Sequence, residues 1–293
     1  NNVTSIYYDR NKMLWLKHVD ELYLFENQKI SNRLDTILQN RFRHNTQVVQ
    51  DIENNYWIGP HEQLLYKFNP INMEVDTFMC QTNQIKPNTS AQLKQNSKKE
   101  IYGTIIYQIS ISQSGFPLIS TNKAIQEYNP KTKGFQIIEK IEVPDSMRNY
   151  IIIPVLETPD NTYVYAIQDK LFLKNSKNTY QINLQSVDKV MCVMSDYEKN
   201  LWIGTTNGLF IIDLSNSNIQ QGVIHINSTP ENQLYSDKIW NIFEDHSHNI
   251  WIGTDKGLNR YRKSKFNIIN IDNERFTTQP MATDNHGNIF LLT

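Results

Sequence analysis

Short apolar segments alternate with polar turns along the chain, and this pattern repeats. The two clearest copies read NLWIGTTNGLFIIDL from Asn200 and NIWIGTDKGLNRYR from Asn249. In each copy one apolar segment precedes the tryptophan segment, and two more follow a glycine-containing turn. Segments rich in Val, Ile, Trp and Tyr, bounded by Asn, Asp and Gly, are typical of β-strands joined by tight turns. No helical apolar period persists anywhere in the chain, so we expect an all-β fold.

Weaker copies of the same pattern extend the repeat over the whole chain. The tryptophan position of the repeat falls at seven residues, which are Trp15, Trp57, Pro117, Val164, Trp202, Trp251 and Phe290. Their mean spacing of about 46 residues lies within the range of about 20 to 50 that marks repeat architectures. Four short antiparallel strands in a unit of this size form one propeller blade. We therefore predict a single domain over residues 1–293, a β-propeller of about seven four-stranded blades whose last blade is incomplete.

The tryptophans and glycines of the repeat are expected to build the blades. A tryptophan wedged between neighbouring sheets buries about 150–250 Å² of surface. The first glycine avoids a collision with the next sheet, and the second sits in a hairpin turn that favours positive φ. Residues given this structural role are Trp15, Trp57, Gly59, Trp202, Gly204, Gly208, Trp251, Gly253 and Gly257. An aspartate ahead of each second strand can accept hydrogen bonds from turn amides; these are Asp9, Asp51, Asp160, Asp196, Asp245 and Asp284.

Composition narrows the class of protein. The chain has 293 residues, 39% of them hydrophobic, and a net charge of −1. It therefore carries no overall basic field, and we expect it to bind no nucleic acid. No apolar run approaches the roughly 18 residues of a membrane helix. Two cysteines, Cys80 and Cys192, define neither a disulfide framework nor a metal site, and whether they pair is left open.

The motif D-x-x-x-N-L-W-I-G-T-x-x-G-L resembles the two-component regulator propeller repeat. Asp196–Leu209 and Asp245–Leu258 match it best, and Asp51–Leu64 matches in part. The family resembles the periplasmic sensor half of hybrid two-component systems in Bacteroides-type bacteria. There, a β-sandwich domain, a membrane helix, a histidine kinase, a receiver and a DNA-binding domain follow the blades, and the ligands of many members are glycan fragments. The resemblance implies that this chain is a fragment of a membrane-anchored, homodimeric periplasmic receptor that controls transcription.

No catalytic constellation, phosphate-binding loop or dinucleotide fingerprint is found, so we expect no catalytic residues and no cofactor. The histidines of HSH, His246–His248, lie in a polar turn, and we expect no metal site there. Function is then expected in the loops of the face that carries the glycine turns. Aromatic rings and planar donors suit an oligosaccharide or another small ligand. The candidate ligand-binding residues are Arg41, Arg43, Arg148, Tyr235, Trp240 and Arg275.

Two alternatives to a ligand sensor stay open. One is a propeller enzyme similar to the streptogramin lyase type, which would place histidines and carboxylates at the mouth of the channel, usually with a metal. His44 is the one histidine that we place on the loop face, so this chain is not expected to be an enzyme itself. The other alternative is a protein-interaction propeller. A screen of thermal stability against oligosaccharides, together with metal analysis, discriminates among the three.

Overall fold

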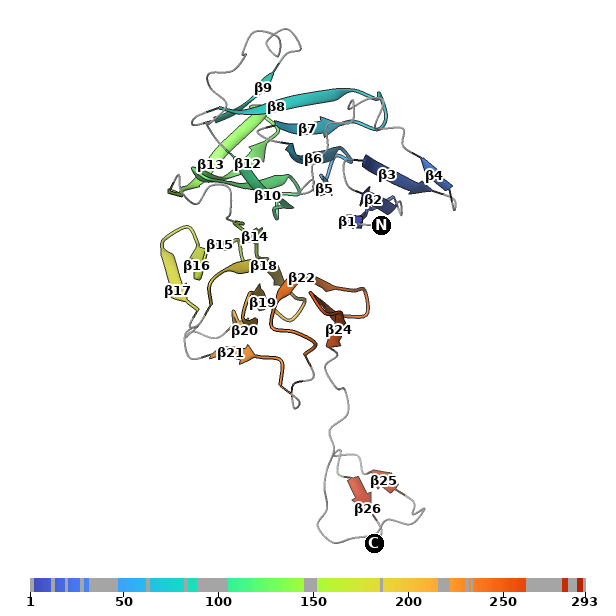
Figure 1. Ribbon diagram of the computed structural model, residues 1–293, viewed down its shortest axis with the longest axis vertical. Coiled ribbons are helices and arrows are strands. Elements are labelled where there is room, and N and C mark those ends of the chain that lie inside the picture. Colours follow the sequence, from blue (N-terminus) through green and yellow to red (C-terminus); the bar gives the residue numbers. More distant parts are fainter. Residues whose placement is uncertain are drawn as a thin grey trace. The chain divides into compact units, whose positions relative to one another are not determined.

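The fold was described from a computed structural model (Figure 1). The structure describes residues 3–11, 14–18, 21–26, 29–31, 47–61, 64–81, 84–88, 105–144, 152–184, 187–215, 222–229, 232, 234–261, 281–283 and 289–291. Among these residues there is no α-helix, and hence no helix long and apolar enough to cross a membrane. The chain divides into two compact units, Asn1–Tyr261 and Arg262–Thr293. That one domain spans both units stays a prediction.

Strands account for nearly all of the regular structure described. Those of the first unit are β1 (Val3–Tyr8), β2 (Leu14–His18), β3 (Glu21–Glu26), β4 (Lys29–Ser31), β5 (Gln47–Gln50), β6 (Tyr56–His61), β7 (Leu64–Phe68), β8 (Val75–Gln81), β9 (Gln84–Asn88), β10 (Ile106–Ile111), β11 (Pro117–Thr121), β12 (Ala124–Asn129), β13 (Gly134–Lys140), β14 (Val155–Glu157), β15 (Tyr163–Ile167), β16 (Lys170–Lys174), β17 (Thr179–Asn183), β18 (Val190–Ser195), β19 (Asn200–Thr205), β20 (Gly208–Asp213), β21 (Val223–Ile226), β22 (Ile239–Glu244), β23 (Ile250–Thr254) and β24 (Leu258–Tyr261). Those of the second unit are β25 (Met281–Thr283) and β26 (Ile289–Leu291).

The strands form antiparallel sheets in strict chain order, which confirms the all-β propeller fold. We number the sheets of the first unit 1 to 6: β1–β4, β5–β9, β10–β13, β14–β17, β18–β21 and β22–β24. The prediction of about seven four-stranded blades is wrong, because five of the described sheets are complete blades. Sheet 6 has three described strands, and β25 and β26 form a separate pair. Sheet 2 adds a fifth strand, β9, which occupies part of the long spacing between the second and third copies.

The turn between the first two strands of a sheet is the same in sheets 2 to 6. Its first residue donates a backbone hydrogen bond to the residue four positions later, as Asp51 N does to Asn55 O at 2.9 Å. The fourth residue of each turn has a positive φ of 59° to 83°; these residues are Asn54, Gly115, Asn161, Lys199 and His248. This left-handed position closes the hairpin, and four of its five occupants are not glycine. His248, in the HSH segment, is one of them.

The register of the hairpins fixes which residue occupies the tryptophan position. Trp57 pairs with Val49 in sheet 2, and Leu118 pairs with Ser110 at the same place in sheet 3. The position therefore falls on Leu118 in sheet 3, one residue after Pro117.

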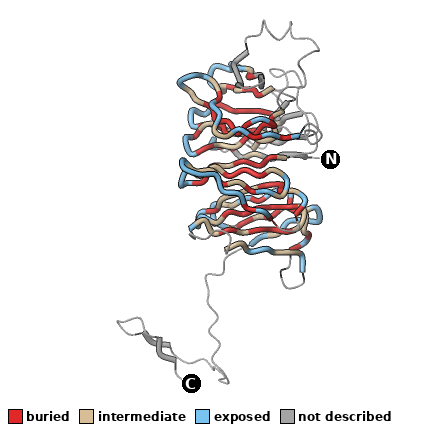
Figure 2. Tube along the Cα trace, turned by 90° about the vertical axis from the view of Figure 1, so that its left-hand side faces the viewer, coloured by how far each residue is buried: buried red, intermediate tan, exposed pale blue. Residues whose placement is uncertain are grey.

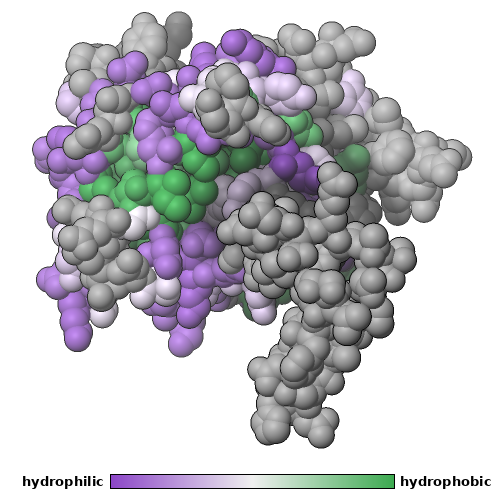
Figure 3. Space-filling model, turned by 90° about the horizontal axis from the view of Figure 1, so that it is seen from below, coloured by the Kyte–Doolittle hydropathy of each residue, from purple (hydrophilic) through white to green (hydrophobic). Residues whose placement is uncertain are grey.

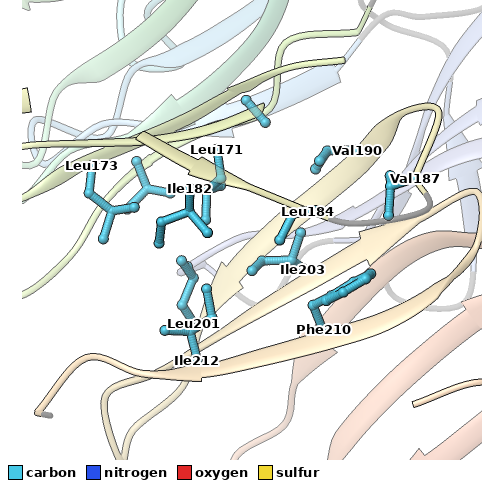
Figure 4. Packing of buried hydrophobic residues seen from close by; sticks show 12 residues of the cluster. Leu171, Leu173, Ile182, Leu184, Val187, Val190, Leu201, Ile203, Phe210 and Ile212 are labelled. Carbon is cyan, nitrogen blue, oxygen red and sulfur yellow. The ribbon is translucent and has the colours of Figure 1, made fainter. Parts of the chain in front are cut away.

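Apolar cores lie between successive sheets. Figure 2 shows buried residues running along the strands of one sheet after another. The largest cluster joins sheets 4 and 5, where Leu171 and Ile182 face Leu201 and Ile212 (Figure 4). A blade cannot cover its own two faces, so each sheet depends on its neighbours for most of its apolar burial.

Trp15, Trp57 and Trp202 each pack against an aromatic ring of the next sheet. Trp57 is fully buried, and its ring centroid lies 4.7 Å from that of Tyr128. Trp202 lies 5.2 Å from Tyr261 in the same way. Gly204 allows the close approach of sheet 6, since a Cβ there would lie 2.6 Å from Ile239 Cγ2. These residues join blades, as a structural role requires.

Candidate ligand-binding surface

Two of the six predicted ligand-binding residues lie within the described part of the chain. Arg41, Arg43, Arg148 and Arg275 lie outside the described residues. Tyr235 and Trp240 are both described, and both flank the glycine turn Thr254–Gly257 at one end of sheet 6. Tyr235 packs on Gly257, and Trp240 follows Ile239, which pairs with Thr254. The structure therefore places these two aromatic residues at the same end of the same sheet.

The segment leading into β22 is tied to the glycine turn of sheet 5. The carbonyl oxygen of Asp237 accepts a hydrogen bond from Gly208 N at 2.6 Å. The carboxylate of Asp237 accepts a second from Ser228 N. Gly208 has a φ of 100°, a conformation that other residues rarely adopt, and a Cβ there would lie 2.8 Å from His225 Nε2. The segment is thereby held at two points close to Tyr235.

Tyr235 presents its ring to solvent on a fixed backbone. Its backbone N donates a 3.0 Å hydrogen bond to Asn259 Oδ1 of sheet 6. A Cβ placed on Gly257 would lie 3.4 Å from the ring of Tyr235, so one side of the ring rests on this glycine. The side chain is nevertheless 61% exposed. An aromatic ring held in this way offers an apolar contact surface at little cost in conformational entropy.

Trp240 is the extra residue of a β-bulge between β22 and β23. The register shifts between Ile239 and Asn241, which leaves Trp240 unpaired in the ladder. Its side chain is 48% exposed, and Lys238 Nζ lies 4.6 Å from the centroid of its ring. An exposed indole beside an ammonium group combines apolar contact with a hydrogen-bond donor. This combination suits the C–H faces and hydroxyl or acidic groups of sugars.

A second exposed aromatic pair lies at the opposite end of sheets 5 and 6, and the sequence reasoning missed it. Tyr197 is 74% exposed, and its ring centroid lies 4.5 Å from that of His248. Glu244 links the two, because Oε2 accepts from Tyr197 N at 2.9 Å and Oε1 contacts His248 Nδ1 at 2.7 Å. Tyr197 and His248 lie one and three residues after the motif aspartate, and these turn positions could have indicated that they are exposed.

Figure 3 shows one face of the molecule, with apolar and hydrophilic residues side by side.

Carboxylates, thiols and imidazoles do not gather into a metal site within the described residues. No group of three or more His, Cys, Asp or Glu is placed to hold an ion there. Cys192 is a free, buried cysteine, and burial raises the pKa of its thiol to about 12. The side chain of Cys80 lies outside the described part of the structure.

Comparison with known proteins confirms the resemblance of the repeat. Residues 236–256, which include Trp240 and Trp251, match the family model described as two component regulator propeller. No curated protein matches the chain.

Solved structures share the fold at low sequence identity. One is the extracellular domain of a protein described as a hybrid two-component system from B. thetaiotaomicron, with 19% identity and a TM-score of 0.53. It aligns with 99% of this chain, and this chain spans 42% of its length. Virginiamycin B lyase from Staphylococcus aureus has 10% identity and a TM-score of 0.60, with coverages of 87% and 78%. PorZ from Porphyromonas gingivalis, a component of the type-IX secretion system, has 11% identity and a TM-score of 0.53, with coverages of 89% and 46%.

Proposed function

We propose that this chain is a ligand-sensing, extracytoplasmic part of a hybrid two-component sensor, and that it recognises a glycan fragment. The observation that carries the proposal is that the family match and the candidate surface coincide. The matched residues 236–256 contain Trp240 and all but the last residue of the turn Thr254–Gly257, and Tyr235 directly precedes them. The neighbour from B. thetaiotaomicron is likewise an extracellular domain. In the whole receptor we place this chain in the periplasm, on a membrane-anchored homodimer with a histidine kinase that controls transcription.

The described surface favours a carbohydrate over a purely apolar ligand. Tyr235 and Trp240 offer ring faces to solvent, while Lys238 supplies a charged donor at the ring of Trp240. Sugars present apolar C–H patches bounded by hydroxyl groups, so they need both kinds of contact. If the fragment is acidic, the predicted contributions of Arg41 and Arg43 add planar donors for its carboxylates.

A signal requires that the ligand favour one arrangement of the protein over another. The segment that carries Tyr235 is bonded to sheet 5 through Asp237 and to sheet 6 through Asn259. A ligand that contacts Tyr235 and Trp240 together therefore acts on the junction of these two sheets. This chain acts as the sensor, and it carries no catalytic role of its own.

Thermal stability measured against a panel of neutral and acidic oligosaccharides tests the proposal. A ligand at about 100 times its Kd stabilises the folded state by about 2.7 kcal/mol, which raises the Tm. Tyr235→Ala and Trp240→Ala should remove this rise. Tyr180→Ala is the matched control, because Tyr180 is 50% exposed on β17 and belongs to another sheet.

Three outcomes would contradict the proposal. The first is that no oligosaccharide raises the Tm. The second is that Tyr180→Ala abolishes the rise as fully as Tyr235→Ala does. The third is turnover of a substrate with stoichiometric metal, which would instead favour an enzyme of the lyase type.

A further inference from the structure

The loop between sheets 5 and 6 carries Tyr235 and is closed at its base by one side chain. It runs from Asn227, directly after β21, to Lys238, directly before β22, and the structure describes residues 227–229, 232 and 234–238 of it. Asp237 Oδ1 accepts a hydrogen bond from the backbone N of Ser228 at 2.5 Å. The two bonded residues lie nine positions apart, so this bond brings the two ends of the loop together. Loops of about 6–16 residues whose ends are close together are frequently functional.

The backbone of Asp237 fastens the base of the loop to sheet 5. Its carbonyl oxygen accepts a hydrogen bond from Gly208 N at 2.6 Å. Gly208 belongs to the glycine turn of sheet 5, and a Cβ at this position would lie 2.6 Å from Asn227 Oδ1. The turn therefore lies against both ends of the loop, and Asp237 is bonded to the turn and to the start of the loop at once.

The residues that precede Asp237 alternate between the core and the surface. Leu234 is buried in the core between sheets 5 and 6, and Ser236 is buried as well. Tyr235, between them, directs its ring to solvent. Trp240 follows three residues after Asp237. Asp237 therefore lies between the two exposed aromatic residues in the chain, and its bonds fix the segment that joins them.

The carboxylate of Asp237 serves as a hydrogen-bond acceptor and not as the partner of a cation. None of the ion pairs among the described residues includes it. The ammonium group of the next residue, Lys238, lies over the ring of Trp240 instead, 4.6 Å from its centroid. An asparagine would keep an acceptor oxygen at the same place, whereas an alanine has none. These two substitutions therefore separate closure of the loop from the charge of the side chain.

We propose that Asp237 is a positioning residue of the ligand-binding surface, a role that rests on the proposed function. By closing the loop and fastening it to sheet 5, it presents Tyr235 and Trp240 together to one ligand. An arrangement that is held before binding does not have to be ordered by the ligand, and the affinity is higher for that reason. Asp237 acts through these two rings and needs no contact of its own with the ligand.

Asp237→Ala and Asp237→Asn test this assignment. The probe is the oligosaccharide that raises the Tm of the wild type most in the panel of neutral and acidic oligosaccharides, and calorimetry measures its Kd. Loss of one hydrogen bond to a charged acceptor corresponds to a change of about tenfold in an equilibrium constant, so Asp237→Ala should raise the Kd about tenfold. Asp237→Asn should keep a Kd close to that of the wild type. Equal losses in the two variants would overturn the proposal, since closure of the loop would then not be what matters.

Asp188 supplies a matched control at the preceding junction. Like Asp237, it stands one residue before the lysine that directly precedes the first strand of a sheet, here Lys189 before β18. Its side chain is exposed, so Asp188→Ala should leave both the Kd and the Tm close to those of the wild type. If Asp188→Ala raises the Kd as much as Asp237→Ala does, the loss of a negative charge explains both changes and the proposal is wrong.

Amide hydrogen exchange in the wild type tests the same link without any substitution. Coupling between two equilibria is reciprocal, so a ligand that is favoured by the closed loop favours the bond from Ser228 N to Asp237 in turn. Saturation with the probe should therefore slow exchange at Ser228 about tenfold, although this residue is exposed. An unchanged exchange rate at Ser228 contradicts the proposal, even where Asp237→Ala fails to fold.

Failure of this proposal and failure of the proposed function are distinguishable. If no oligosaccharide raises the Tm of the wild type, the proposed function fails. The position of Tyr235 is then read without a ligand, from its ring signals in the NMR spectrum of protein labelled at tyrosine, which Tyr235→Phe assigns. These signals should shift in Asp237→Ala and keep their wild-type positions in Asp237→Asn and Asp188→Ala. If they do not move in Asp237→Ala, Asp237 does not position Tyr235.

Discussion

The indole Nε1 of Trp202 donates a hydrogen bond to Asp196 Oδ2 at 2.7 Å, across six positions of the sequence. The same aspartate also accepts a bond from the turn amide of Asn200 at 2.7 Å. Three further Asp–Trp pairs of the same spacing make the indole bond at 2.7 to 2.8 Å: Asp9–Trp15, Asp51–Trp57 and Asp245–Trp251. The motif aspartate therefore fixes both the turn and the ring that packs between blades.

Removing the indole donor should destabilise the protein according to how deeply the pair is buried. Trp202→Phe leaves Asp196, which is 9% exposed, without its ring partner. Asp196 Oδ2 keeps its bond from Asn200 Nδ2 at 2.9 Å, so the change removes one hydrogen bond to a charged group, which contributes about 1.5–3 kcal/mol, and lost packing adds to this. Trp251→Phe is the control, because Trp251 is half-buried and should cost less. Urea unfolding measures both variants, and equal losses would contradict this ranking.

The motif glycine should be required in one copy and dispensable in another. A Cβ at Gly204 would lie 2.5 Å from Cys192 Sγ and 2.6 Å from Ile239 Cγ2. Gly204→Ala should therefore cost about 1–3 kcal/mol by overpacking. At Gly253 the nearest contact would be Asn241 O at 3.6 Å, so Gly253→Ala should be neutral or raise stability by up to about 1 kcal/mol. The midpoints of urea unfolding measure both variants. If Gly253→Ala is the more destabilising of the two, contact with the next sheet is not the reason that this position is glycine.

The sequence could predict the fold class because a repeated strand pattern is a local signal. It could not predict the fifth strand of sheet 2, since β9 shows no motif of its own. Nor could it find that Thr158 begins the turn of sheet 4 instead of Asp160, because the turn depends on backbone bonds such as Thr158 N to Thr162 O at 2.9 Å. Register is set by turn geometry, and residue identity reports that geometry only in part.

Of the candidate site, the sequence could predict which aromatic residues lie in or next to loops, but not how the fold supports them. Tyr235 and Trp240 are exposed as a binding role requires, but the sequence did not show that Gly257 supports the ring of Tyr235. It also missed the hydrogen bond from the Tyr163 hydroxyl to Glu127 Oε2, because this bond joins residues of two sheets that lie 36 positions apart. Such contacts follow from the stacking of the blades.

Asp245 should make the protein sensitive to acid. Hydrogen bonds from the Trp251 indole and the Asn249 side chain lower the pKa of its carboxyl below the ordinary value. A lowered folded-state pKa contributes stability that is present above the unfolded value of about 3.9 and is lost as the pH falls below it. Asp245→Asn should thus reduce the Tm at pH 7 and leave a smaller difference below pH 4.

Asp255→Asn is the control for this titration, because Asp255 is an exposed aspartate of the same sheet. Its Tm at pH 7 should equal that of the wild type, because a substitution at an exposed position changes stability little. If Asp245→Asn follows the wild type down to pH 3, the hydrogen bonds of Asp245 do not favour its ionised form in solution.

A bond between turns that recurs at other junctions is absent from the junction of sheets 4 and 5, and its restoration should stabilise the protein. The donor is the backbone N–H of the second residue in the turn between the first two strands of a sheet. The acceptor is the side chain of the residue just before the corresponding turn of the next sheet. This occurs from Arg10 to Gln50 at 2.9 Å and from Tyr197 to Glu244 at 2.9 Å. Between sheets 4 and 5 the donor position is Pro159, which has no N–H, and Ser195 Oγ is buried without a partner among the described residues.

Pro159→Ala combined with Ser195→Gln should recreate this bond, because Gln50 makes it at the equivalent place. Alone, Pro159→Ala should cost about 0.4–1 kcal/mol through the greater freedom of the unfolded chain. A double-mutant cycle isolates the new interaction, for which we expect a favourable coupling of about 0.5–1.5 kcal/mol. Ser195→Ala replaces Ser195→Gln in the control cycle and should couple by nearly zero, since alanine cannot accept a bond. Equal coupling in the two cycles would mean that the missing proline N–H is not what leaves Ser195 unpaired.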